Sequence, residues 1–246
     1  MTNLMDFHTH ILPGIDDGAK DVDISRLMLK SLADQGATLV CLTPHYYHNQ
    51  ETKESFLEKR AAAYAQIEAY GKELELTLAL GSETHLTRDL ASERDLTDLC
   101  LGKSKLLLLE FPYGCEFKAD TLFQVERISN NCGVTPVLAH IERYPQLIKK
   151  NSKPLAELFD IGCYVQCNIS SFASNKKLIK LLSDGIVNFV GTDCHNMDSR
   201  SPDFQAGVKA IKQKLGESFW EGFLSEMRDR SKRIAITQPI QQGGQT

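Results

Sequence analysis

The feature that most constrains the fold is a repeated alternation of short apolar runs with amphipathic segments. Seven such runs, many of them β-branched, recur at residues 4–7, 39–42, 74–80, 106–109, 134–139, 164–167 and 187–190. Runs that are apolar at consecutive positions are typical of parallel strands buried on both faces. The sequence therefore predicts a parallel sheet at the centre of the fold.

Helical patterns separate these runs. They cover residues 21–35, 53–70, 122–132, 154–161, 176–184, 204–215 and 218–227, and the second is expected to stop at Gly71. Strands that alternate with helices predict an α/β fold with the helices outside the sheet. The local pattern alone does not separate a closed barrel from an open sheet. A single barrel typically needs about 250 residues, and this chain has 246.

Composition excludes several classes of protein. Lys and Arg number 28 and Asp and Glu 32, a net charge of −4 that does not suit a nucleic-acid-coating protein. No apolar run approaches the roughly 18 residues of a membrane span, and the first residues do not match a secretory signal. Seven cysteines without a CxxC pair are typical of free thiols in a reducing compartment. We therefore expect a cytoplasmic protein with no membrane insertion and no nucleic-acid partner.

Histidines and carboxylates follow six of the seven expected strands. The nine candidate ligands are His8, His10, Asp17, His45, Glu83, Glu110, His140, Asp193 and His195. The carboxyl ends of parallel strands form the catalytic edge of β/α folds. So many charged groups in one crevice need cations to hold them together. A nitrogen and oxygen set without cysteine suits Mn, Fe or Zn better than Mg or Ca, so the sequence predicts a metal centre.

The motifs at these strand ends resemble the PHP (polymerase and histidinol phosphatase) superfamily. The segments that carry the resemblance are HTHILPGIDDGA, TPHYY, GSE, LLEFP, AHIERY and GTDCHN, between residue 5 and about residue 202. More narrowly, they resemble bacterial metal-dependent protein-tyrosine phosphatases from capsule and exopolysaccharide loci. The resemblance implies a single distorted (β/α)7 TIM-like barrel over residues 1–236, with the metal site at the C-terminal ends of the strands. We expect the polar, Gly-rich residues 237–246 to be a disordered tail.

The resemblance also implies a role for each candidate ligand. One metal would be held by His8, His10, Glu83 and Asp193, and Glu83 would bridge to a second metal held also by Glu110 and His140. A third would take Asp17, His45 and His195, and it stays open whether Glu110 also reaches it. Arg143 and Arg200 would bind phosphate and, with Asp17, form the catalytic set.

The implied activity is hydrolysis of phosphotyrosine in proteins by a metal-bound hydroxide. The expected cofactors are three divalent ions, manganese first and Fe, Zn or Co as alternatives, and the expected partner is a bacterial tyrosine autokinase. Three divalent ions bring +6 and four carboxylates −4, and the remaining charge of about +2 attracts a phosphate monoester dianion. Three alternatives stay open: another superfamily phosphoesterase such as a histidinol-phosphate phosphatase, a metal amidohydrolase, and a non-catalytic phosphotyrosine binder. Glu110 stands where an amidohydrolase would carry a lysine.

Several other residues invite a functional interpretation. Cys194 and Arg200 have the Cys-x5-Arg spacing of cysteine-dependent phosphatases, but no glycine lies between them. A loop whose backbone amides all face phosphate favours glycine, so we interpret the match as chance. Asp16 and Glu142 are candidate proton donors or, equally, hydrogen-bonding partners. His48 and His85 are expected at the rim or the surface.

Overall fold

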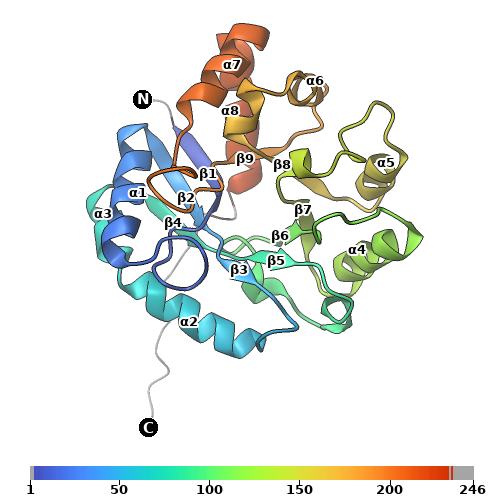
Figure 1. The fold of residues 1–246 in the computed structure, drawn as a ribbon, viewed down its shortest axis with the longest axis horizontal. Helices are drawn as coiled ribbons and strands as arrows, with labels where there is room; N and C mark the ends of the chain where they lie inside the picture. Colours follow the sequence, from blue (N-terminus) through green and yellow to red (C-terminus); the bar gives the residue numbers. More distant parts are fainter. Residues whose placement is uncertain (1–2, 233, 235–246) are drawn as a thin grey trace.

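A curled parallel sheet lies at the centre of the fold, with helices outside it (Figure 1). The computed structural model describes residues 3–232 and residue 234. Its seven main strands are β1 (Leu4–Thr9), β2 (Ala37–Leu42), β4 (Thr77–Leu80), β6 (Leu106–Glu110), β7 (Thr135–Leu138), β8 (Tyr164–Asn168) and β9 (Phe189–Gly191). Each overlaps one of the apolar runs, so the predicted α/β fold with a parallel sheet is confirmed. The tail predicted over residues 237–246 lies outside the described residues.

Helices follow the strands in the expected order. The α-helices are α1 (Val22–Asp34), α2 (Lys53–Ala65), α3 (Glu68–Glu73), α4 (Ala119–Asn131), α5 (Lys153–Asp160), α6 (Lys176–Ser183), α7 (Gln205–Leu215) and α8 (Glu217–Ser231). Short 3-10 helices are η1 (Leu90–Ser92), η2 (Thr97–Leu99), η3 (Ile141–Arg143) and η4 (Ile169–Ala173). Polar side chains cap several helix starts, as where Asp21 accepts a hydrogen bond from the Ile24 N–H. Among the described residues, no helix combines the length and apolar character that a membrane span requires.

The largest departure from the predicted helices lies between β3 (His45–Tyr46) and β4. The helix expected over residues 53–70 is two helices, α2 and α3, and Gly71 lies inside α3 rather than ending it. A Cβ atom at Gly71 would lie 2.4 Å from Cδ1 of Leu78 on β4. This glycine therefore allows close packing of helix on strand, which sequence periodicity does not reveal. The following strand starts only at Thr77, because a left-handed Glu75 (φ 56°) first turns the chain.

The sheet curls until its first and last strands lie side by side. The pairings run β1–β2–β4 and β3–β5–β6–β7–β8–β9, all parallel, with β3 (His45–Tyr46) and β5 (Glu83–His85) as two short additional strands. The ends of β1 and β9 are joined by backbone hydrogen bonds from Asp193 N to His8 O (2.8 Å) and from His10 N to Cys194 O (2.9 Å). Residues from both ends of the chain therefore meet at one edge of the sheet.

The two short strands were not predicted, yet they set the register of the candidate ligands. β3 follows β2 and β5 follows β4, each after a break of two residues. In the parallel pairing of β3 with β5, His45 lies opposite Glu83. In the pairing of β5 with β6, His85 lies opposite Glu110. Segments this short, built from His, Glu and Tyr, lack the apolar run that marks a buried strand.

Two helical glycines provide a test of the packing between α7 and η4. A Cβ atom at Gly207 would lie 1.9 Å from the carbonyl oxygen of Ile169, whereas one at the exposed Gly222 would meet nothing within 4 Å. We expect Gly207→Ala to lower the free energy of unfolding by about 1–3 kcal/mol through overpacking. Gly222→Ala, the matched control, should raise it by about 0.5–1 kcal/mol. Urea unfolding measures both, and equal effects would contradict the packing.

Candidate metal centre

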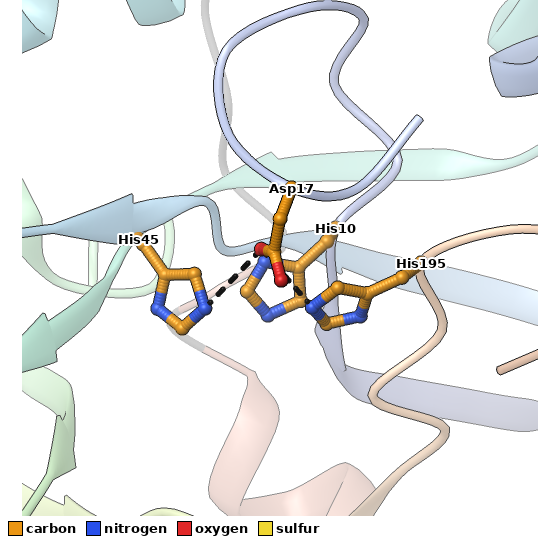
Figure 2. A group of neighbouring side chains, drawn as sticks. All are labelled: His10, Asp17, His45 and His195. Atoms are coloured by element: carbon orange, nitrogen blue, oxygen red, sulfur yellow. Dashed lines mark ion pairs between the residues drawn. The ribbon is translucent and has the colours of Figure 1, made fainter. Parts of the chain in front are cut away.

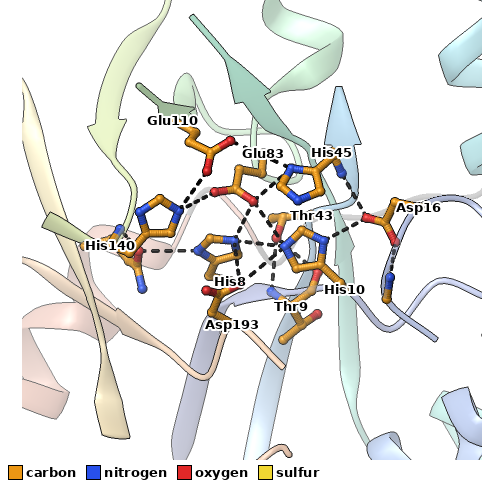
Figure 3. A network of polar contacts seen from close by, with 12 residues as sticks. His8, Thr9, His10, Asp16, Thr43, His45, Glu83, Glu110, His140 and Asp193 are labelled. Carbon is orange, nitrogen blue, oxygen red and sulfur yellow. Dashed lines mark hydrogen bonds and ion pairs between the residues drawn. The ribbon is translucent and has the colours of Figure 1, made fainter. Parts of the chain in front are cut away.

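The carboxyl ends of the strands bring the nine predicted ligands together. His8 lies on β1 and His10 directly after it, and His45, Glu83 and Glu110 lie on β3, β5 and β6. The other four, Asp17, His140, Asp193 and His195, lie in the loops that follow β1, β7 and β9. Eight of the nine side chains form three overlapping groups that could each hold a metal ion, and the ninth, His140, contacts Glu83 and Glu110 beside these groups. Figures 2 and 3 show these groups from close by.

The first group is completely buried and consists of His8, His10, Glu83 and Asp193, whose ligand atoms lie within 4.8 Å of one another. Glu83 Oε2 lies 3.1 Å from His8 Nε2 and 3.2 Å from His10 Nε2. Asp193 Oδ1 lies 3.5 Å from each of the same two nitrogens. The two histidines are two residues apart in extended chain, so their rings point to the same side.

The second group surrounds the carboxylates of Glu83 and Glu110. His45 completes a possible metal site with them, and its Nδ1 lies 3.2 Å from Glu83 Oε2. His140 Nε2 lies 2.7 Å from Glu83 Oε1 and 3.4 Å from Glu110 Oε1. Glu83 therefore contacts His8, His10, His45 and His140, which come from the end of β1, from β3 and from the loop after β7 (Figure 3).

The third group lies closer to solvent and contains Asp17, His45, His195 and also His10. Asp17 Oδ1 lies 3.5 Å from His45 Nε2 and 3.4 Å from His195 Nε2 (Figure 2). Asp17 is 64% exposed whereas His195 is buried, so this group opens the centre to solvent. The sequence did not place His10 here.

The donor atoms of these groups fit divalent cations. His8 Nε2 and His10 Nε2 face each other at 3.1 Å. The buried atoms His45 Nδ1 and His195 Nε2 make no hydrogen bond with any described residue, although carboxylate oxygens lie 3.2 and 3.4 Å away. Buried polar atoms without a partner are costly and rare. Imidazole nitrogens and carboxylate oxygens that converge in this way suit Mn, Fe or Zn.

The electrostatics of the centre also call for cations. Burial opposes ionisation of Glu83, but the interactions with His8, His10 and His140 outweigh it and hold its pKa well below the usual range. For Glu110, hydrogen bonds from His140 and His85 likewise outweigh burial and lower the pKa to about 2. Burial, with the charges of His10 and Arg200, lowers the pKa of His195 to about 4. The carboxylates are thus charged and His195 is neutral, which are the forms that bind metals. Burial lowers the pKa of His10 and of His140, but hydrogen bonds with carboxylates outweigh it and raise these pKa values to about 10 and about 9, so a metal ion that binds there has to displace a proton.

Two predicted proton donors are hydrogen-bonding partners in the structure. Asp16 Oδ2 lies 2.7 Å from His10 Nδ1 and also accepts a hydrogen bond from the backbone N–H of His45. A carboxylate behind a metal-binding histidine fixes the tautomer and the direction of its ring. Glu142 accepts hydrogen bonds from the Asn168 N–H and the Ser171 hydroxyl, and burial raises its pKa.

Arg143, at the end of η3, and Arg200, in the loop after β9, flank the centre. Both contact Asp193, Arg143 Nη2 at 2.5 Å from Oδ2 and Arg200 Nη2 at 2.8 Å from Oδ1. Their side chains are 43% and 36% exposed, so both guanidinium groups border the buried donors and remain open to solvent. This position suits recognition of an anion at the centre.

The two remaining histidines differ in their contacts. His48 lies near the rim, where its Nδ1 is 3.1 Å from the Tyr46 hydroxyl. His85 contacts a candidate ligand: its Nδ1 lies 3.1 Å from Glu110 Oε2, and its ring lies next to Tyr47. Its spacing of two residues from Glu83 could have indicated this, since i and i+2 of a strand share a face.

Cys194 does not have the environment of a nucleophilic thiol. It is fully buried, and burial raises the pKa of its thiol well above the usual value. The thiolate is the reactive form of cysteine. The structure therefore supports a chance origin of the Cys-x5-Arg spacing.

Known proteins resemble this chain over nearly its whole length. The tyrosine-protein phosphatase CpsB of Streptococcus pneumoniae is 32% identical over 87% of this chain and 91% of its own length. The tyrosine-protein phosphatase YwqE of Bacillus subtilis is 28% identical over 87% and 85%. A crystal structure from work on YwqE and CpsB, described as unique metal-dependent tyrosine phosphatases, matches with a TM-score of 0.72. It is 23% identical and covers 92% of this chain and 95% of that one, which supports the shared fold.

The family described as capsular polysaccharide synthesis, CpsB/CapC, matches residues 4–230. This match and the 32% identical relative confirm the resemblance to the capsule-locus proteins that the strand-end motifs indicated. The chain belongs to the CpsB/CapC family of capsular polysaccharide synthesis.

Proposed function

We propose that the protein is a metal-dependent protein-tyrosine phosphatase of capsule or exopolysaccharide synthesis. The observation that carries the proposal is the convergence of three donor groups on Glu83 and His10, beside two arginines. Such a centre suits a substrate that is a dianion and offers phosphoryl oxygens. The names of the CpsB and YwqE relatives support phosphotyrosine as the substrate.

Three divalent ions, manganese first, are the proposed cofactors. One would be held by His8, His10, Glu83 and Asp193, a second by Glu83, Glu110 and His140, and a third by Asp17, His45 and His195. When bound, these ions supply activated water and neutralise the charge of the phosphoryl oxygens. Asp16 and Gln166 lie behind His10 and His8, where they hold the imidazoles in place.

The arginines and the leaving group complete the proposed chemistry. Arg143 and Arg200 bind the remaining phosphoryl oxygens through charge-assisted hydrogen bonds. With Asp193 engaged by a metal ion, both guanidinium groups are free to turn toward the substrate. A tyrosine phenol has a pKa near 10, so it leaves with less protonation than an aliphatic alcohol does. This accounts for a site in which Asp16 and Glu142 are engaged in other hydrogen bonds.

The setting of this activity is also part of the proposal. We infer that the seven main strands form a distorted (β/α)7 barrel within a single domain over residues 1–236. The proposed substrate is a phosphotyrosine protein, a bacterial tyrosine autokinase first among the candidates, and the proposed location is the cytoplasm.

A phosphatase screen tests the proposal. With Mn²⁺ supplied, kcat/KM for a phosphotyrosine peptide should exceed that for a phosphoserine peptide and for histidinol phosphate by at least about tenfold. Removal of metals with a chelator should abolish turnover, and Mn²⁺ should restore it. The control variant Cys194→Ser should stay within about threefold of the wild type, because the thiol takes no part.

Two results would contradict parts of this account. Full activity in protein verified to be free of metal would end the metal mechanism. Higher efficiency on histidinol phosphate would leave the metal centre in place and refute phosphotyrosine as the substrate.

Glu83→Ala should be among the most damaging substitutions, because this carboxylate contacts four histidines from three donor groups. Loss of a residue that merely orients a metal ligand costs 10–100-fold, so kcat/KM should fall by more than about 100-fold here. Metal analysis should find that more than one ion per chain is lost. The exposed Glu221→Ala on α8 is the control and should retain full metal content; a Glu83→Ala protein that does the same refutes the bridging role.

A further inference from the structure

β8 is the main strand whose end contributes none of the nine candidate ligands, although it lies between β7 and β9, whose loops contribute three. It contributes two amides instead, Gln166 and Asn168. Gln166 is completely buried. The two side chains lie on the same face of the strand and are linked by a hydrogen bond from Gln166 Nε2 to Asn168 Oδ1 (3.1 Å).

These amides contact candidate ligands from three other parts of the chain. Gln166 Oε1 accepts a hydrogen bond from the backbone N–H of His140 at 2.6 Å and lies 3.4 Å from His8 Nδ1. Asn168 Nδ2 donates to Asp193 Oδ2 at 2.9 Å. The pair therefore stands directly behind the first two donor groups.

Two of these three ligands have a strained backbone. His140 (φ 31°) and Asp193 (φ 54°) both adopt the left-handed conformation that non-glycine residues rarely adopt. Such residues persist only where the surroundings hold them, and they are concentrated at functional sites. Gln166 holds the N–H of His140, and Asn168 holds the carboxylate of Asp193, so the amide pair anchors both strained positions.

The direction of each amide follows from the charge of Asp193. A carboxylate only accepts hydrogen bonds, so Asn168 must turn its NH₂ group toward Asp193 and its oxygen toward Gln166. Gln166 must then turn its NH₂ group toward Asn168 and its oxygen toward His8 and His140. An oxygen facing His8 Nδ1 requires that this nitrogen carry a proton, which leaves Nε2 free to face Glu83 and Asp193.

We propose that Gln166 and Asn168 are positioning residues that fix His8 in the Nδ1–H tautomer and hold His140 and Asp193 in their left-handed conformations. The inference rests on the proposed metal site and is independent of the substrate. β8 carries none of the candidate ligands, but its two amides form a chain of polar contacts from the charged Asp193 to the ring of His8. Groups behind metal ligands typically change metal affinity by 10–100-fold.

The test uses the full chain with Zn²⁺ alone, by competition with a chelator and by NMR of ¹⁵N-labelled histidine rings. Gln166→Met removes the acceptor at similar volume. It should weaken Zn²⁺ binding about 10–100-fold and abolish the uniform Nδ1–H signal of His8. Gln166→Glu loses the donor to Asn168 but keeps the acceptor for His8 and His140, so it should retain that signal, with affinity within about tenfold of the wild type. Asn188→Leu is the matched control, because the buried amide of Asn188 also accepts a hydrogen bond from β8, from the N–H of Val165. Its loss should lower stability without changing Zn²⁺ affinity.

The outcomes separate this inference from the proposed function. Wild-type affinity and an unchanged His8 tautomer in Gln166→Met would overturn the positioning role alone. Equal losses in Gln166→Met and Gln166→Glu would overturn it as well, because the acceptor would then be irrelevant. A wild-type chain that binds no Zn²⁺ would overturn the metal site and the inference together.

Discussion

The carboxylate of Glu83 is the group on which the rest of the site depends. It is buried, it is charged, and four imidazoles from β1, the β1 end, β3 and the β7 loop lie around it. An uncompensated charge in such a place would cost several kcal/mol. The strand ends therefore have to converge on it with groups that carry or bind positive charge. Because β3 pairs with β5, His45 lies directly opposite Glu83. The backbone register therefore places one of the compensating imidazoles beside this carboxylate.

A second buried carboxylate holds the two ends of the sheet together. Asp6 on β1 accepts hydrogen bonds from the Thr192 N–H (2.9 Å) and the Thr192 hydroxyl (2.6 Å), directly after β9. It also accepts one from the N–H of His8. This clamp joins positions 186 residues apart in the chain and brings Asp193 to within 3.5 Å of His8. The catalytic edge thus depends on contacts that form only when the sheet is curled.

Much of the fold and the ligand set follows from the sequence, because apolar runs mark buried strands and ligands follow them directly. His8, Glu110 and Asp193 could all be predicted in this way. The contributions of Gln166 and Asn168 could not, because neutral amides look the same in a core as beside a metal. Their meaning depends on register and on left-handed residues such as His140, which emerge only from long-range pairing. The role of Gly71 could not be predicted either, because close packing and helix termination both favour glycine, and the sequence alone does not distinguish them.

On the proposal developed above, the strand ends form one multinuclear metal site around Glu83. Anomalous X-ray diffraction at the manganese edge, from crystals of the chain grown with Mn²⁺, tests it most directly. We expect anomalous peaks within coordination distance of the three donor groups, with Glu83 bonded to two of the ions. Peaks confined to the protein surface, or a single ion that Glu83 does not touch, would contradict it.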